Sequence, residues 1–147
     1  MPGENVLIRN CERKDIEKVI QIENECFDNP YSGEIFYSHV GNDLFLVAED
    51  SENGIVGYIL GTEKEGYGVI ASIAVSPSYR LQGIGKTLMD SIQKIMDVDR
   101  FFITVRPSNK GAIKFYEELN FVKVGKMRDY YENGEDGIVM RKSEGKD

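Results

Sequence analysis

The sequence predicts an α/β domain in which a mixed β-sheet is covered by helices. Short apolar runs alternate with amphipathic segments of helical spacing. Two runs, Leu44–Glu49 and Ile55–Leu60, are joined by an Asn-Gly turn, which is typical of an antiparallel hairpin. Later, the Val69–Val75 run is followed by a helical segment and a strand at Phe101–Arg106, which indicates a crossover between parallel strands.

The expected elements follow one another without repeats or linkers. Ser32 and Asn109 are good N-caps for two of the helices. The expected helices are Asp15–Cys26, a second one after Ser32 that runs through Ile35 and Phe36 to Val40, Gly83–Met96, and Asn109–Leu119. The expected strands are Val6–Arg9, Leu44–Glu49, Ile55–Leu60, Val69–Val75, Phe101–Arg106, Phe121–Arg128 and Gly137–Arg141, with a turn at Gly61–Gly68.

Length and composition fit one globular domain. The chain has 147 residues, which suffices for a proper core, and we expect residues 1–141 to form a single domain, with 142–147 as a disordered polar tail. No apolar run approaches the roughly 18 residues of a membrane span, and the N-terminus lacks the pattern of a signal peptide. Cys11 and Cys26 lack metal-site spacing, so we expect reduced thiols in the cytoplasm.

The net charge of −7 argues against general affinity for nucleic acid. An anionic ligand would therefore depend on local cationic groups and on backbone N–H donors. An acidic surface elsewhere would suit a cationic partner such as an amine.

The segment Arg80–Thr87, RLQGIGKT, comes between the Val69–Val75 strand and an amphipathic helix. Its glycines allow the backbone to approach a ligand closely. The unpaired N–H groups of the first helical turn, together with the positive end of the helix dipole, favour an anion. The segment therefore predicts a site for a phosphorylated cofactor.

Two other phosphate-binding patterns do not fit this segment. The triphosphate loop GxxxxGK[ST] needs glycine where the chain has Arg80, and it needs an acidic residue on a neighbouring strand, which Phe101–Val105 does not supply. The dinucleotide fingerprint GxGxxG fails at Leu88. The pattern [RQ]xxGx[GA] fits from Arg80 to Gly85.

That pattern resembles the acetyl-CoA loop of the GNAT superfamily of N-acetyltransferases. A second motif of the superfamily, N-x-x-A-x-x-[FL]-Y-x-x-x-[GN]-F, is matched in register by Asn109, Ala112, Phe115, Tyr116, Asn120 and Phe121. The two motifs also occur in the expected order. The resemblance implies the GNAT fold, a mixed and mostly antiparallel sheet of six to seven strands with about four helices.

Further segments resemble the protein N-terminal acetyltransferases, which include the bacterial RimI-type enzymes and their archaeal and eukaryotic relatives. These segments are VRPSN at Val105–Asn109, YYENGED at Tyr130–Asp136, and Ile22–Ser32, which is similar to I-E…C-F-x-x-P-[WY]-S. The resemblance covers Val6 to Met140. It implies acetyl transfer to the α-amine of protein N-termini, by direct attack on acetyl-CoA in a ternary complex.

The resemblance also implies how acetyl-CoA is held. Backbone groups of Ile73, Ala74 and Val75 would bind its pantetheine arm, and one N–H there would stabilise the oxyanion. Asn109 would hydrogen-bond the cofactor chain. The pyrophosphate would lie on the N–H groups of Gln82, Gly83, Ile84, Gly85, Lys86 and Thr87, and Arg80 and Leu81 are also expected to bind the cofactor.

We expect Tyr116 to be the catalytic acid and to contact the cofactor. A phenol with a pKa of about 10 is protonated at neutral pH and can donate to a thiolate whose acid has a pKa of about 8.5. A core tyrosine on the inner face of its helix is the alternative.

The general base is less defined, because Thr104 stands where many RimI-type enzymes have glutamate. We take Glu65 as the candidate base acting through water; Glu63, Glu25 and Tyr131 are alternatives, and ordinary solvated charges are the other interpretation of these glutamates. A weak base favours an α-amine, with a pKa of about 8, over lysine, with a pKa of about 10.4.

Three tyrosines are expected to bind the acceptor peptide, since a phenol ring is apolar along its faces and polar at its tip. They are Tyr31, Tyr130 and Tyr131. An exposed turn is the alternative for the last two. We expect no metal site: Glu135 and Asp136 belong to a hairpin turn, and His39 to the surface or a helix cap.

The predicted partners are N-terminal peptides, ribosomal or nascent chains among them, with no nucleic acid and no membrane. We expect a monomer or weak homodimer. Two alternatives stay open. One is acetyl transfer to lysine, a polyamine or a small-molecule amine; the other is an acetyl-CoA-binding module without turnover that needs a partner subunit.

Overall fold

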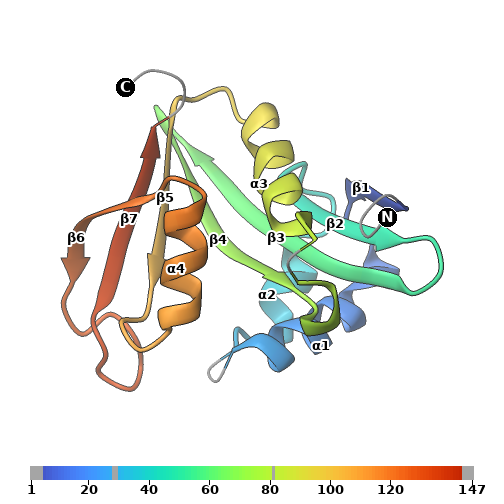
Figure 1. The fold of residues 1–147 in the computed structure, drawn as a ribbon, viewed down its shortest axis with the longest axis horizontal. Helices are drawn as coiled ribbons and strands as arrows, with labels where there is room; N and C mark the ends of the chain where they lie inside the picture. The colour runs from blue at the N-terminus through green and yellow to red at the C-terminus, as the bar shows by residue number, and fades with distance from the viewer. Residues whose placement is uncertain (1–4, 28–29, 81, 144–147) are drawn as a thin grey trace. The chain divides into compact units, whose positions relative to one another are not determined.

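The computed structural model describes residues 5–27, 30–80 and 82–143, which form one mixed sheet and four α-helices (Figure 1). The seven strands have the order β1-β2-β3-β4-β5-β7-β6, and β4 and β5 are parallel while β1–β2, β2–β3, β5–β7 and β6–β7 are antiparallel. This is the GNAT fold that the sequence predicts. None of the helices in the described part of the chain is long and apolar enough to cross a membrane.

The strands are β1 Val6–Asn10, β2 Phe45–Asp50, β3 Gly54–Lys64, β4 Tyr67–Val75, β5 Arg100–Val105, β6 Val122–Met127 and β7 Gly137–Ser143. The helices are α1 Ile16–Cys26, α2 Gly33–Ser38, α3 Ile84–Ile95 and α4 Lys110–Glu118, with short 3-10 turns η1 Arg13–Asp15 and η2 Pro77–Tyr79. Gly54 has a φ of 77°, as the Asn-Gly turn between β2 and β3 requires.

Several element boundaries differ from the sequence-based expectation. The second helix ends at Ser38, before Val40. The expected turn at 61–68 is mostly strand, because the N–H of Gly61 continues the pairing by donating to the carbonyl of Leu44, and only Glu65 and Gly66 remain in the turn.

The tail prediction was also wrong for two residues. Lys142 and Ser143 belong to β7, where they pair with Phe101 and Arg100 of β5. Because these two residues are polar, their sequence shows no sign of a strand, which is instead formed by backbone pairing with β5. Residues 144–147 lie outside the described part of the chain.

Two compact units can be distinguished, and they are described separately below. The first unit contains residues 1–61 and 72–97, and the second contains residues 62–71 and 98–147.

In the first unit, helices cover both faces of the sheet. A Cβ at Gly57 would lie 3.3 Å from Leu88 of α3. The next residue, Tyr58, packs its ring 5.6 Å from that of Phe36 in α2 and contacts Glu23 of α1. Successive strand residues face opposite sides, so α3 lies on one face and α1 with α2 on the other, as Figure 1 shows.

In the second unit, β5 alternates between buried and half-buried residues, and its buried side chains belong to the core. The core of this unit comprises Ile70, Phe101, Ile103, Val105, Tyr116, Leu119, Phe121 and Met140. Strand β6 forms the edge of the sheet, and all its residues are exposed.

Candidate active site

The N-terminus of α3 has the geometry of an anion site. Gly83 is the N-cap residue with a φ of 82°, a left-handed conformation that glycine adopts without strain. It has no side chain that could accept hydrogen bonds from the N–H groups of the first helical turn. This arrangement fits the pyrophosphate of acetyl-CoA.

The other residues of the predicted cofactor loop vary in exposure. Ile84 and Gly85 are buried, Gln82 is half-buried, and Lys86 and Thr87 are exposed. The ammonium of Lys86 donates to Asp90 at 2.8 Å, one helical turn away. Leu81 lies outside the described residues.

Arg80 links this loop to the end of β4. Its Nε donates to the carbonyl of Val75 at 3.2 Å, and its Nη2 donates to Sγ of Cys26 at 3.1 Å. Burial raises the pKa of the Cys26 thiol, although the contact with Arg80 opposes this effect. Cys26 was not predicted to meet the loop; its place in the I-E…C-F segment was the only signal.

The end of β4 is where the pantetheine arm is expected. Ile73 and Ala74 are buried, and Val75 is half-buried. A Cβ on Gly57 of the neighbouring strand would lie 3.1 Å from the carbonyl oxygen of Ala74. Glycine at this position therefore lets the two backbones approach closely.

A buried polar cluster lies between α1 and the sheet of the first unit. Glu23, which is 2% exposed, accepts a hydrogen bond at Oε1 from the hydroxyl of Tyr58 and another at 3.0 Å from Ser72. Its Oε2 accepts from the N–H of Tyr31 at 2.9 Å. The carboxyl group thus holds the segment after α1, where Tyr31 is 43% exposed, against the core.

The sequence analysis missed this cluster as a unit. Glu23 was noted only as part of a motif, and Tyr58 and Ser72 were not singled out. The available signal was a polar residue inside each of two apolar strands. Burial and the contact with Glu23 raise the pKa of Tyr58, so its hydroxyl stays protonated and donates.

Tyr116 lies in the core of the second unit and is 5% exposed. Its ring lies 5.5 Å from that of Phe115 and 6.1 Å from that of Phe121. Helix α4 is capped by Asn109, whose side chain accepts a hydrogen bond from the N–H of Ala112 at 3.1 Å. This position is compatible with a structural role in the core as well as with a role as the catalytic acid. The catalytic role of Tyr116 therefore stays a prediction.

Tyr130 and Tyr131 lie together in the second unit, with ring centroids 4.9 Å apart. Tyr130 is 48% exposed, whereas Tyr131 is half-buried beneath the guanidinium of Arg106. A Cβ at Gly137 would lie 2.6 Å from Thr104 and 3.0 Å from the ring of Tyr130. Thr104 and Tyr130 therefore both pack against Gly137.

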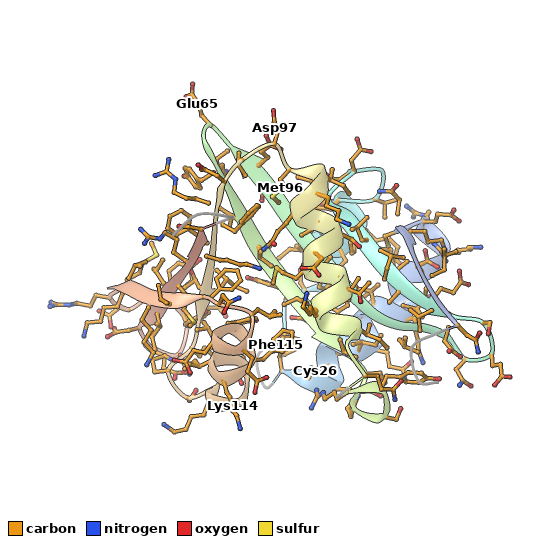
Figure 2. All side chains as sticks on the ribbon, turned by 45° about the horizontal axis from the view of Figure 1, so that its top comes forward. Cys26, Glu65, Met96, Asp97, Lys114 and Phe115 are labelled. Atoms are coloured by element: carbon orange, nitrogen blue, oxygen red, sulfur yellow. The ribbon has the colours of Figure 1, made fainter. Side chains whose placement is uncertain are left out.

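Glu65 lies in the turn that precedes β4, whereas Ile73, Ala74 and Val75 are the last three residues of that strand. Glu65 projects from the tip of the β3–β4 hairpin (Figure 2). Eight residues separate Glu65 from Ile73, about 26 Å of extended strand at about 3.3 Å per residue. We therefore leave Glu65 out of the proposed site.

Two of the alternative bases, Glu25 and Glu63, lie on regular secondary structure. Glu25 is exposed and accepts a hydrogen bond from Gln21, and Glu63 lies within β3. Over residues 5–27, 30–80 and 82–143, no three His, Cys, Asp or Glu side chains gather as a metal site would require.

Comparison with known proteins identifies the family. Residues 16–121 match the acetyltransferase (GNAT) family. The chain belongs to this family and is an acetyl-CoA-dependent N-acetyltransferase.

The chain is 32% identical to an N-alpha-acetyltransferase of Saccharolobus solfataricus, over 94% of this chain and 93% of that protein. Its structure is similar to that of Ard1 from Thermoplasma volcanium, with a TM-score of 0.87 and 26% identity over 97% of this chain and 99% of the other. It is also similar to the ribosomal-protein-S18-alanine N-acetyltransferase of Escherichia coli, with a TM-score of 0.78 and 26% identity over 97% and 96%. These matches confirm the superfamily and the subfamily that the sequence resembles.

Proposed function

We propose that this acetyltransferase modifies the α-amine of protein N-termini. The similarity to an archaeal N-alpha-acetyltransferase over nearly the whole of both chains supports this substrate class. The similarity to the enzyme for ribosomal protein S18 supports ribosomal or nascent chains as acceptors.

The observation that carries the proposal is Thr104 beside Tyr130, both packed against Gly137. At a position that holds glutamate in many RimI-type enzymes, this chain offers a hydroxyl that does not accept a proton at neutral pH. A substantial fraction of the amine must then already be unprotonated when it binds. An α-amine, with a pKa of about 8, has one at pH 7, whereas lysine, with a pKa of about 10.4, does not.

Every step of the reaction except the loss of the amine's proton, which passes to solvent water, is assigned to residues of this chain. Acetyl-CoA supplies a thioester carbonyl that an amine can attack. The first turn of α3, with Arg80 and Lys86 nearby, binds the pyrophosphate, while backbone groups of Ile73–Val75 hold the pantetheine arm and stabilise the developing oxyanion. Tyr116 donates the proton that the departing thiolate needs.

The acceptor is bound by Tyr31, Tyr130 and Tyr131 in this proposal. Tyr31 and Tyr130 expose 43% and 48% of their surface, which leaves their rings available to a peptide. We place the reaction in the cytoplasm, supported by the free thiols of Cys11 and Cys26, and carried out by a monomer or weak homodimer.

The proposal predicts that the pH dependence follows the substrate. At subsaturating peptide, the rate rises about tenfold per pH unit below the α-amine pKa of about 8 and levels off above it, because only the neutral amine reacts. Two peptides that differ in the pKa of their first residue test this in initial-rate assays. The inflection should move with the peptide's pKa; a common inflection for both peptides would indicate a base on the enzyme.

A further inference from the structure

We propose that Glu135 is a positioning residue that holds the acceptor-binding loop in an ordered conformation in the peptide-free enzyme. The loop in question is the β6–β7 loop, residues 128–136, which carries Tyr130 and Tyr131. Glu135 joins it to the β5–α4 turn, residues 106–109. The inference rests on the proposed function, since it assigns this loop to the peptide.

Both oxygens of the Glu135 carboxylate are engaged across the two segments. Oε2 accepts a hydrogen bond from the backbone N–H of Ser108 at 3.0 Å. Oε1 accepts from Nη1 of Arg106 at 3.3 Å and from the amide of Asn133 at 3.3 Å. The side chains of Arg106 and Glu135 are only 20% and 24% exposed, so this ion pair is better shielded from solvent than a typical surface pair.

The electrostatics agree with this geometry. The hydrogen bond from Ser108 lowers the pKa of Glu135 to about 2, with further contributions from Asn133 and Arg106. A carboxylate with a lowered folded-state pKa stabilises the fold above its unfolded value of about 4.3, and this stabilisation disappears only as the pH falls through about 2. The contacts of the ionised Glu135 carboxylate are therefore present throughout the pH range in which an amine can be acetylated.

Backbone hydrogen bonds and a cation–π contact also order the loop around its tyrosines. The N–H of Tyr131 donates to the carbonyl of Glu135 at 3.0 Å, and the N–H of Gly134 donates to the carbonyl of Tyr131 at 2.9 Å. Arg106, which binds Glu135, also lies 3.9 Å from the centre of the Tyr131 ring. One guanidinium thus fixes the carboxylate and one ring, while the neighbouring Tyr130 stays exposed.

On the other side, the β5–α4 turn leads directly into the helix that carries Tyr116. Ser108, which donates to Glu135, precedes Asn109, the N-cap of α4. A loop that is already ordered loses little conformational freedom when a peptide binds. Loosening it should therefore weaken peptide binding more than it changes the chemical step.

The test compares Glu135→Gln with Glu132→Gln, an exposed glutamate of the same loop. The expected result for Glu135→Gln is a rise of about tenfold in the KM for the peptide, because charge-assisted hydrogen bonds are replaced by weaker neutral ones. The kcat and the calorimetric Kd for acetyl-CoA should change little, and amide hydrogen exchange at residues 128–136 should become faster without peptide. Glu132→Gln should match wild type in all four measurements.

Arg106→Lys provides a second variant, which keeps the charge but loses the guanidinium that lies over the Tyr131 ring. It should show smaller increases in the peptide KM and in the exchange rate of the loop. It provides the test if Glu135→Gln does not fold. An unchanged peptide KM with unchanged exchange in the loop would overturn the inference. Failure of the wild type to acetylate any peptide would instead contradict the proposed function, and the exchange data would still show whether Glu135 holds the loop.

Discussion

Replacing Tyr116 with phenylalanine is expected to lower kcat by about 10²- to 10⁴-fold, the usual contribution of a positioned acid. The substitution removes only the hydroxyl. The ring contacts with Phe115 and Phe121 remain, so the protein should fold and bind acetyl-CoA as before. The decrease should appear in kcat under saturating concentrations of both substrates, measured as thiol release.

A matched control is Tyr67→Phe, which removes a hydroxyl from another tyrosine of the second unit. Tyr67 is 38% exposed, and its ring makes an edge contact with that of Phe102, with the centroids 5.5 Å apart. Its kcat should equal that of wild type. If Tyr116→Phe also turns over at the wild-type rate, Tyr116 is a core residue and the proton for the thiolate comes from elsewhere.

Replacing Glu23 with alanine is expected to destabilise the protein by about 3 kcal/mol. The side chain accepts hydrogen bonds from Tyr58, Ser72 and the N–H of Tyr31. Without it, these donors lose their buried acceptor, although Tyr58 and Ser72, whose hydroxyl oxygens are 3.0 Å apart, can still bond each other. Urea unfolding of the purified protein measures the loss.

Asn24→Ala is the control for this prediction, because Asn24 is the next residue of α1 and is exposed. Its free energy of unfolding should stay within about 0.5 kcal/mol of wild type. Glu23→Gln should lie between the two, since the amide keeps one acceptor oxygen. Equal stability of Glu23→Ala and wild type would show that the cluster does not hold α1 and the Tyr31 segment to the sheet.

Local sequence signals predicted the elements to which the motifs assign cofactor binding. The glycine-spaced loop before α3 and the Asn109 cap before α4 are short-range patterns, and the structure places both where the motifs indicated. The turn at 61–68 and the tail at 142–143 were mispredicted, because polar side chains in those strands hid backbone pairing with distant partners.

The hydrogen bonds of Glu23 and Glu135 join residues far apart in the sequence, and no local pattern predicts them. Glu23 meets Ser72, 49 residues away, and Glu135 meets Ser108, 27 residues away. Each had appeared only inside a motif or as an ordinary turn residue. For Glu65, in contrast, a local signal was misleading. Glu65 was predicted as the base because it directly precedes β4 in the sequence, but it precedes the first residue of that strand, and Ile73–Val75 are the last three.

The most direct test of the proposed function measures thiol release from acetyl-CoA with one lysine-containing peptide in two forms. One form has a free α-amine and the other has it blocked, so the two differ only at the proposed acceptor. We expect release with the free form alone, and a mass increase of one acetyl group at its first residue. Equal release with both forms would contradict acetylation at the N-terminus and indicate lysine or general amines as the acceptor.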